Sequence, residues 1–263
     1  MWLFFKAALL LELQSLKKYR FLIFIQLFHL VVLLSLFFYI SLMLDQSKTL
    51  DFEYFGFVTQ GLAFSFLYQS FVNSSASYLH DWRMQGVLEP ILQGPLSHWK
   101  IFLSIGWIGC LKAFLKSIGL LLLAAMVFNY SLSIYNGVLV FFSLLVIFFI
   151  SQCLSLISVS SLLLWKRVNL VGVVSSLGLA ILSGVYFPLS LLPEWLRIIG
   201  NFLPFRHGLE IFRYGLSGTP SEFGLKGNVI VCLSWAFLLL PLSIYFYQAS
   251  EKKLLSQGGL NHL

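Results

Sequence analysis

The chain has 263 residues, of which 59% are hydrophobic and only 10% are charged. A soluble domain is on average about 45–50% apolar and about 25% charged, so this composition excludes an ordinary soluble protein. The net charge of +7 does not indicate nucleic-acid binding, because the basic residues are scattered near the ends of apolar runs. The sequence shows no strand-like alternation, which argues against a β-barrel and leaves a helical membrane protein.

The first residues, 1–20, mix apolar sequence with Lys6, Glu12, Lys17 and Lys18, so they do not read as a cleavable signal peptide. We expect them to form an interfacial helix along the inner face of the membrane. The alternative is a simple N-terminal extension of the first span.

Six apolar runs follow that could each cross a bilayer, which takes roughly 20 residues. They lie at 21–44, 55–77, 101–128, 137–164, 169–187 and 228–248. The sequence therefore predicts an all-α polytopic membrane protein with six transmembrane helices. We expect one transmembrane domain over 1–263, with spans one to five in 21–187, an outer segment in 188–226, and span six with a cytoplasmic tail in 227–263.

The distribution of lysine and arginine predicts the orientation. Ten of them flank the expected inner ends of the spans and five flank the outer ends, while Lys112 and Lys116 lie inside a span. Because cytoplasmic loops carry the excess of positive charge, both termini are expected in the cytoplasm. A multi-pass protein of the plasma membrane, in a bacterium the inner membrane, follows from this pattern.

No catalytic or metal-binding motif is found. The phosphate-loop pattern G-x-x-x-x-G-K-[ST] is missing, as are H-E-x-x-H, G-x-S-x-G and C-x-x-C. The cysteines Cys110, Cys153 and Cys232 lie inside apolar runs without nearby ligand spacing. We therefore expect no catalytic residue, metal or cofactor in this chain, and any nucleotide hydrolysis would need another chain.

The segment 86–100, GVLEPILQGPLSHWK, separates the second and third spans on the expected cytoplasmic side. Its apolar residues Leu88, Ile91, Leu92 and Leu96 recur near the helical period. The pattern indicates a short helix parallel to the membrane, which a partner protein could grip to move both attached spans. A connector without a partner fits the same residues equally well.

A second mixed segment, 188–216, precedes the last span. Pro193 and Pro204 are expected to begin two short helices that end near Gly200 and Gly215, and neither could span at 1.5 Å per residue. The spacing would allow ion pairs between Glu194 and Arg197, Arg206 and Glu210, and Glu210 and Arg213. The apolar residues between them favour a pair of helices that dip into the outer leaflet; a solvated loop is the alternative.

Lys112 and Lys116 lie four residues apart on one face of the third span. A lysine at the bilayer centre costs about 2.5–3.5 kcal/mol on insertion scales, so such residues usually face an interior path. Lys112 could instead extend to the inner headgroups, whereas Lys116 lies about 6 Å deeper. We expect at least Lys116 to face a translocation path and meet an anionic substrate group, such as a phosphate or carboxylate.

Two stretches resemble ABC-2 type transporter permeases. They are DWRMQGVLEPILQGPLSHWKIFL, similar to that family's cytoplasmic signature, and SGVYFPLSLLPEWLRIIGNFLPFRHGLEIFRYGL, similar to its segment before the last span. With six spans and an N-terminal interfacial helix, the resemblance extends over essentially the whole chain. Pro90 departs from the family pattern, where a polar helix former is usual, and puts the helix start in doubt.

This resemblance implies an export function. It implies a permease that moves a lipid-linked, polysaccharide or amphipathic small-molecule substrate outward, paired with a second permease as a homodimer in membrane lipid. Two copies of a separate ABC ATPase subunit would bind ATP and Mg and dock on a cytoplasmic coupling helix. That helix would contain Gln85, Gly86, Leu88, Glu89, Leu92, Pro95 and Ser97.

The resemblance also implies that 188–226 is an outer re-entrant helical hairpin that acts as a gate. Its residues would include Pro188, Pro193, Glu194, Pro204, Glu210 and Arg213. A heme-exporter-like permease of cytochrome maturation is the alternative within transport. Outside transport, the alternatives are a membrane scaffold and an intramembrane enzyme. In such an enzyme, only Lys112, Lys116 and His29 could be catalytic residues.

Overall fold

The computed structural model describes residues 20–47, 53–87, 90–91, 98–165, 178–221 and 223–256, and their regular secondary structure is entirely helical. The expected interfacial helix at 1–20 lies outside these residues, apart from Arg20. The long helices are α2 (Arg20–Ser47), α3 (Tyr54–Met84), α5 (His98–Phe128), α6 (Gly137–Trp165) and α11 (Gly224–Ser256). The short ones are α8 (Leu179–Leu182), η2 (Leu189–Leu191), α9 (Glu194–Phe202) and α10 (Pro204–Ser217).

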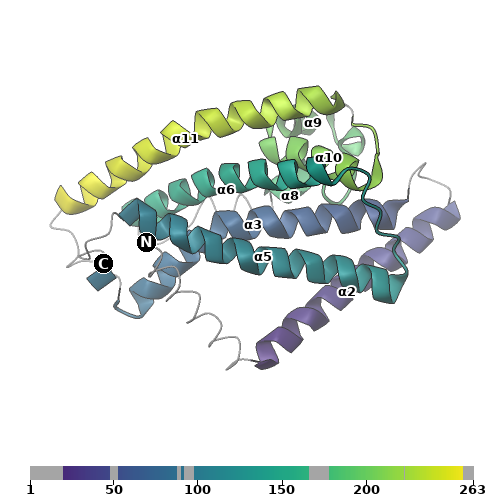
Figure 1. The fold of residues 1–263 in the computed structure, drawn as a ribbon, viewed down its shortest axis with the longest axis horizontal. Coiled ribbons are helices and arrows are strands. Elements are labelled where there is room, and N and C mark those ends of the chain that lie inside the picture. The colour runs from purple at the N-terminus through teal and green to yellow at the C-terminus, as the bar shows by residue number, and fades with distance from the viewer. Residues whose placement is uncertain are drawn as a thin grey trace.

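The long helices form an elongated bundle (Figure 1). Helix α3 lies in its middle and packs against α5 and α6, and α6 also packs against α10 and α11. Helix α2 crosses the bundle diagonally and contacts α3 and α5 more sparsely. Many large apolar side chains of α2 and α11 face away from the bundle, as expected of helices that contact lipid.

Four helices are long and apolar enough to cross a membrane. These spans are Phe24–Leu44, Ser104–Phe128, Gly137–Leu163 and Gly224–Lys253. They coincide with the first, third, fourth and sixth runs expected from the sequence. The prediction of a helical protein with several membrane spans is therefore confirmed for these four.

The second and fifth expected spans are not among these four helices. Helix α3 has 31 residues and is about 46 Å long at 1.5 Å per residue, but it is less apolar than the four spans. Its central place explains this composition, because several of its polar side chains, such as Thr59, Gln60 and Ser65, are buried within the bundle rather than exposed to lipid. Most of the fifth run, 169–187, lies outside the described residues, which contain only its last part with α8. The count of six spans remains a prediction.

At one end of the bundle, two asparagines mark the end of α5 and the start of α6. Helix α5 stops where Asn129 takes a left-handed conformation (φ 54°), which asparagine tolerates better than most residues. The Oδ1 of Asn136 then accepts hydrogen bonds from the N–H groups of Val138 and Leu139, which caps α6. Tyr130 and the serines that follow it are thereby held beside the start of α3.

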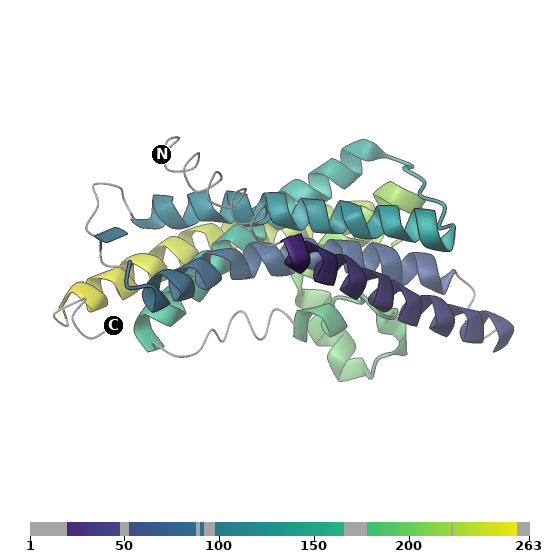
Figure 2. The same cartoon turned by 90° about the horizontal axis from the view of Figure 1, so that it is seen from below.

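The short elements α8, η2, α9 and α10 form a compact group at this same end (Figure 2). Pro204 occupies the first turn of α10, and Gly218 ends that helix in a left-handed conformation. The helices expected after Pro193 and Pro204 are thus present, and each extends two residues beyond its predicted end. Their insertion into the outer leaflet remains a prediction.

The core has two apolar clusters. The larger one fills the bundle from α2 to α11 and includes Phe64, Phe71 and Phe205. The smaller one joins the far ends of α3, α5, α6 and α11 through residues such as Leu79, Phe102, Leu163 and Tyr247. Ile91, from the segment after α3, packs against this smaller cluster.

Candidate functional site

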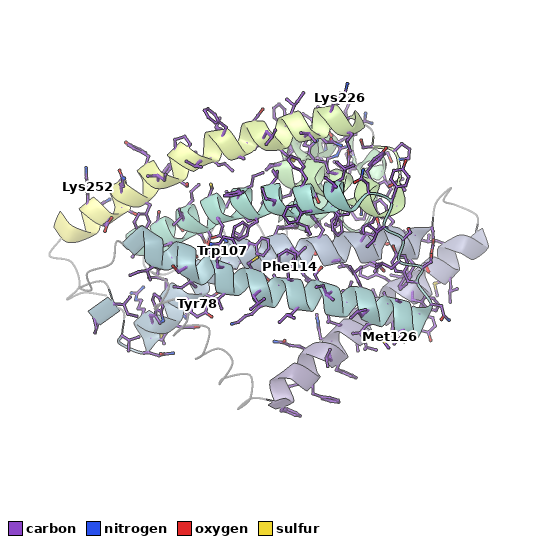
Figure 3. All side chains as sticks on the ribbon, viewed as in Figure 1. Tyr78, Trp107, Phe114, Met126, Lys226 and Lys252 are labelled. Carbon is purple, nitrogen blue, oxygen red and sulfur yellow. The ribbon has the colours of Figure 1, made fainter. Side chains whose placement is uncertain are left out.

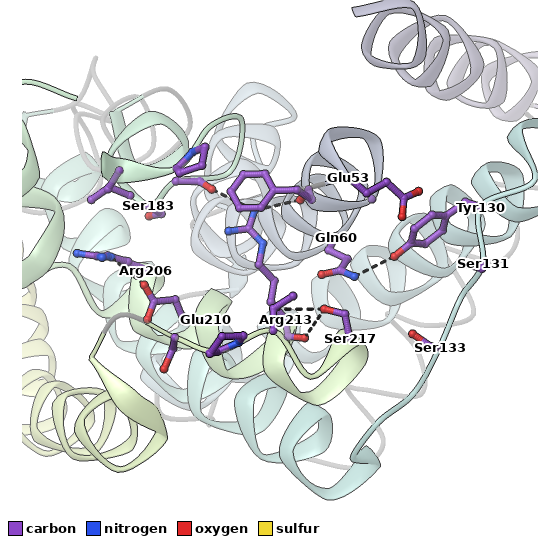
Figure 4. A pocket seen from close by; sticks show the side chains of 18 residues that line it. Glu53, Gln60, Tyr130, Ser131, Ser133, Ser183, Arg206, Glu210, Arg213 and Ser217 are labelled. Carbon is purple, nitrogen blue, oxygen red and sulfur yellow. Dashed lines mark hydrogen bonds and ion pairs between the residues drawn. The ribbon is translucent and has the colours of Figure 1, made fainter. Parts of the chain in front are cut away.

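A pocket of about 460 Å³ lies where the start of α3, the loop before α6 and the short helices meet (Figure 4). We call it the polar pocket because most of the residues that line it are polar or charged, while most of its surface is apolar. It combines charged residues with several serines. Its lining includes Glu53, Gly56, Phe57, Gln60, Tyr130, Ser131, Ser133, Ser183, Gly184, Pro188, Leu189, Arg206, Glu210, Arg213, Ser217, Thr219, Pro220 and Ser221. In this view Ser183, Arg206 and Glu210 lie on one side, Glu53 and Tyr130 on the other, and Arg213 and Gln60 between them.

Arg213 fastens α10 to two other parts of the chain. Its Nη2 donates hydrogen bonds to the carbonyl oxygens of Phe57 (3.0 Å), Gly184 (3.1 Å) and Val185 (3.4 Å). Its guanidinium carbon lies 3.5 Å from the centre of the Phe57 ring, a cation–π contact. Burial lowers the pKa of Arg213 to about 9 and the Glu210 carboxylate opposes this shift, so the guanidinium stays charged at neutral pH.

A chain of hydrogen bonds connects α9, α10 and α11. Arg206 Nε donates to Glu210 Oε1 at 3.1 Å, and Asn228 Nδ2 donates to Glu210 Oε2 at 2.9 Å. His207 Nδ1 lies 2.7 Å from Asn228 Oδ1, and its Nε2 lies 2.8 Å from the carbonyl oxygen of Asn201. Both ring nitrogens of His207 thus lie within hydrogen-bond distance of an oxygen atom.

The opposite side of the pocket carries a buried amide–phenol pair. Gln60 Nε2 donates a hydrogen bond of 2.8 Å to the Tyr130 hydroxyl, and Glu53 lies exposed beside them. Burial raises the pKa of Tyr130, while the bond from Gln60 lowers it and the charge of Glu53 raises it further. The phenol is therefore protonated at neutral pH and can donate a hydrogen bond.

The residues predicted for an outer gate fall into three groups. Pro188, Glu210 and Arg213 line the pocket. Pro193 and Pro204 stand at the starts of α9 and α10. Glu194 lies exposed on the first turn of α9 and lines no described pocket.

Of the three ion pairs that helical spacing allowed, the structure forms one. Arg206 and Glu210 pair as predicted. The pairing of Glu210 with Arg213 is wrong, because the Arg213 side chain turns to carbonyl oxygens of α3 and of the turn after α8. Glu194 and Arg197 are both exposed and form no ion pair with each other. An ion pair between two exposed side chains would add little to stability, because both charges are already hydrated.

Lys112 and Lys116 both lean from α5 onto aromatic side chains of α3. Lys112 is exposed, and its Nζ donates a hydrogen bond of 3.3 Å to the Tyr78 hydroxyl. Lys116 is half-buried, with its Nζ 4.0 Å from the centre of the Phe66 ring. Neither lysine lines the polar pocket. The two share the face of α5 on which Leu111, Leu115 and Ile118 are exposed.

The expected coupling segment is described only in part. Gln85 follows the end of α3, and Gly86 has a left-handed conformation (φ 68°) that turns the chain. Leu88, Glu89, Leu92, Pro95 and Ser97 lie outside the described residues. Pro90 and Ile91 are helical, and the Ile91 N–H donates a hydrogen bond of 3.3 Å to the Val87 carbonyl.

Sequence reasoning missed several residues of this site. No pattern in the sequence singles out Glu53, Gln60, Tyr130, Ser183 or Asn228. The available signal was the polar run between the third and fourth spans together with glutamine near the outer end of the second. Within the described ranges, no group of three or more His, Cys, Asp or Glu side chains is placed to hold a metal ion.

Comparison with known families gives one match. The model of the ABC-2 type transporter family matches residues 4–217, which include the segment after α3, both lysines and most of the pocket. A search of curated proteins finds none whose sequence matches this chain.

Proposed function

Because the chain belongs to the ABC-2 type transporter family, we propose that it is the permease subunit of an ATP-driven exporter. The substrate would be lipid-linked, a polysaccharide or an amphipathic small molecule, and it would move outward. ATP and Mg would be bound by two copies of a separate ABC ATPase chain, since this sequence has no phosphate-binding loop. Two permease chains would pair in the plasma membrane, with both termini in the cytoplasm.

The observation that best supports coupling to an ATPase is the place of Ile91. It belongs to the segment between α3 and α5, and it packs against the cluster that joins the ends of α3, α5, α6 and α11. A partner that pulled on this segment would act on all four helices at once, because packed interiors shift as units rather than deform locally. We assign the ATPase-docking role to Gln85, Gly86, Leu88, Glu89, Leu92, Pro95 and Ser97.

The substrate path is proposed to include Lys116 and Lys112. Lys116 is half-buried within an apolar span, and the described structure gives its ammonium an aromatic ring in place of a carboxylate. A cation–π contact offsets part of the desolvation cost and leaves the charge available to an anionic group of a substrate.

The outer gate is proposed to consist of α9 and α10. Trp195, Ile198, Ile199 and Phe202 form one apolar stripe along α9, spaced i, i+3, i+4 and i+7. This stripe faces away from the protein, with Trp195 64% and Phe202 69% exposed. An apolar stripe of this kind supports a place for α9 in the outer leaflet, with Arg213 and the Asn228–Glu210 hydrogen bond holding α10 to the bundle.

The proposed orientation agrees with the charges on α11. Lys226 and Lys252 mark its opposite ends (Figure 3), and the second is followed directly by Lys253. The end with two lysines is expected in the cytoplasm, together with the segment after α3.

A photo-crosslinking amino acid at position 88 tests the association with an ATPase. We expect it to form a covalent product with a chain that contains a phosphate-binding loop, identified by mass spectrometry of the purified product. The control places the same amino acid at Leu191, which is exposed at the opposite end of the molecule. Crosslinking to the ATPase from position 191, or from neither position, would contradict the proposal.

A further inference from the structure

The geometry points to a carbohydrate-binding site: we infer that the polar pocket binds a sugar-like group, through the Gln60–Tyr130 pair, Glu53 and Ser183. This inference rests on the proposed export function and narrows its substrate to a sugar or sugar-headed lipid. The pocket volume of about 460 Å³ lies within the range of about 300–1,000 Å³ usual for small-molecule sites.

The Gln60–Tyr130 pair offers a ligand one acceptor and one donor side by side. Because Gln60 Nε2 donates to the Tyr130 oxygen, the phenol hydrogen remains available to a ligand. The Oε1 of Gln60 forms no hydrogen bond within the described parts of the chain. A single hydroxyl group can donate a hydrogen bond to Gln60 Oε1 and accept one from the Tyr130 phenol. Sugars carry several such groups.

Ser183 supplies a further unused hydroxyl. Its side chain is 2% exposed, it lines the pocket, and its Oγ has no hydrogen-bond partner among the described residues. A buried polar atom without a partner costs free energy, which a ligand hydroxyl would recover. Ser131 and Ser221 line the same pocket; Ser131 is exposed and Ser221 is partly buried.

The charges of the pocket argue against a strongly ionic ligand. Its described lining carries two arginines and two glutamates, so the formal charges cancel. Arg206 is paired with Glu210, and Arg213 is bonded to three carbonyl oxygens. Of these four charged residues, Glu53 is the one that is exposed, as an acceptor at one side of the pocket. The Arg213 Nε is buried without a hydrogen-bond partner among the described residues and is a further donor that a hydroxyl oxygen could satisfy. We take neutral hydroxyl groups as the ligand chemistry that these donors and acceptors fit.

Binding can be measured on the full chain in lipid nanodiscs prepared without sugar-headed detergent. Native mass spectrometry would measure how many molecules of each of three probes bind to one chain. Maltose represents a free sugar, dodecyl maltoside below its micellar concentration represents a lipid-linked sugar, and dodecylphosphocholine is a matched amphiphile without sugar. We expect saturable binding of one maltose or dodecyl maltoside per chain. Binding of maltose itself would indicate a free saccharide, and binding of dodecyl maltoside alone a sugar attached to a lipid.

Tyr130→Phe is the decisive variant, because it removes one hydroxyl and keeps the buried ring. It is expected to weaken sugar binding about fivefold to tenfold, as loss of one hydrogen bond does. Tyr135→Phe removes a hydroxyl from the same loop outside the pocket lining and is the control, expected to bind normally. Glu53→Gln, at an exposed position, gives a second test that does not disturb the core.

The inference is overturned if neither sugar probe binds saturably, if Tyr130→Phe and Tyr135→Phe bind alike, or if dodecylphosphocholine binds as tightly as dodecyl maltoside. The crosslink from position 88 is measured on the same preparations. A chain that crosslinks to an ATPase but binds no sugar refutes only the sugar site, and a chain that binds sugar without an ATPase refutes the export function.

Discussion

Gly61 sets how closely α3 approaches the turn that follows α8. A Cβ atom at this position would lie 2.9 Å from Arg213 Nη2 and still closer to the Val185 carbonyl oxygen. The backbone contact leaves little room for relief, because a carbonyl in a turn cannot rotate away as a flexible side chain can. Gly61 is therefore what allows Arg213 to reach its carbonyl partners.

Gly61→Ala is expected to lower the free energy of unfolding by about 1–3 kcal/mol, the usual cost of overpacking. The measurement is unfolding of the purified chain by heat or denaturant. Gly119→Ala is the control, because no atom lies within 4 Å of its added Cβ and alanine is the better helix former. Equal destabilisation by the two substitutions would refute the close-contact argument.

Lys116 is the residue on which the proposed substrate path depends most. Lys116→Met keeps the length of the side chain and removes its charge. We expect the substrate concentration that half-maximally stimulates ATP hydrolysis to rise at least tenfold, since a hydrogen bond to a charged group contributes about 1.5–3 kcal/mol. Lys226→Met, at the exposed start of α11, serves as the control. Unchanged stimulation in Lys116→Met would remove this residue from the path.

At the scale of elements, α9 is the helix whose surroundings are most open to test. Its apolar stripe contacts little of the protein, and Gly200 is its one buried residue. Gly200 lies against Leu189 and the Leu182 carbonyl. This close contact and the His207–Asn201 hydrogen bond hold the helix while its stripe stays outside. Lipid would cover that stripe if α9 lies in the outer leaflet.

Trp195 reports on this position by fluorescence. In vesicles of brominated lipid, we expect Trp195 to be quenched, because bromine quenches indole only at short range. Its contribution is the difference between the unmodified chain and Trp195→Phe, which corrects for the other tryptophans. A Trp195 signal that aqueous iodide quenches and brominated lipid does not would place α9 in solvent.

The sequence predicted the helices better than it predicted their contacts. Proline at the helix starts was sufficient to locate α9 and α10, because these signals act within a few residues. Gln60 and Tyr130 are 70 residues apart, and Arg213 and Phe57 are 156 apart, so no local pattern could pair them. The same limit explains the wrong pairing of Glu210 with Arg213, where a tertiary partner replaced the neighbour on the helix.

The composition of α3 illustrates a second limit. Hydropathy recognises a span by the lipid that it faces, and α3 is surrounded by protein. Its polar residues Thr59, Gln60 and Ser65 are buried against neighbouring helices. A helix of sufficient length can therefore fail a hydropathy criterion because of its central place in the bundle.

At the scale of the whole molecule, the same helices connect the pocket with the smaller apolar cluster. Helix α3 contributes Gln60 to the pocket and Leu79 to the smaller apolar cluster. Helix α11 contributes Asn228 to the chain of hydrogen bonds that connects it with α9 and α10, and it contributes Tyr247 to the smaller apolar cluster. A displacement imposed near Ile91 would reach the pocket along rigid helices, which is what an ATP-driven gate requires.

The most direct test of the export proposal is the rate of ATP hydrolysis by the chain purified with its ATPase in nanodiscs. Glu89→Arg inverts a charge in the proposed docking segment, and Lys226→Glu inverts a charge at the exposed start of α11. We predict that Glu89→Arg lowers the hydrolysis rate at least tenfold and that Lys226→Glu leaves it unchanged. Equal rates in the two variants, or purification of the unmodified chain without any ATPase, would contradict the account.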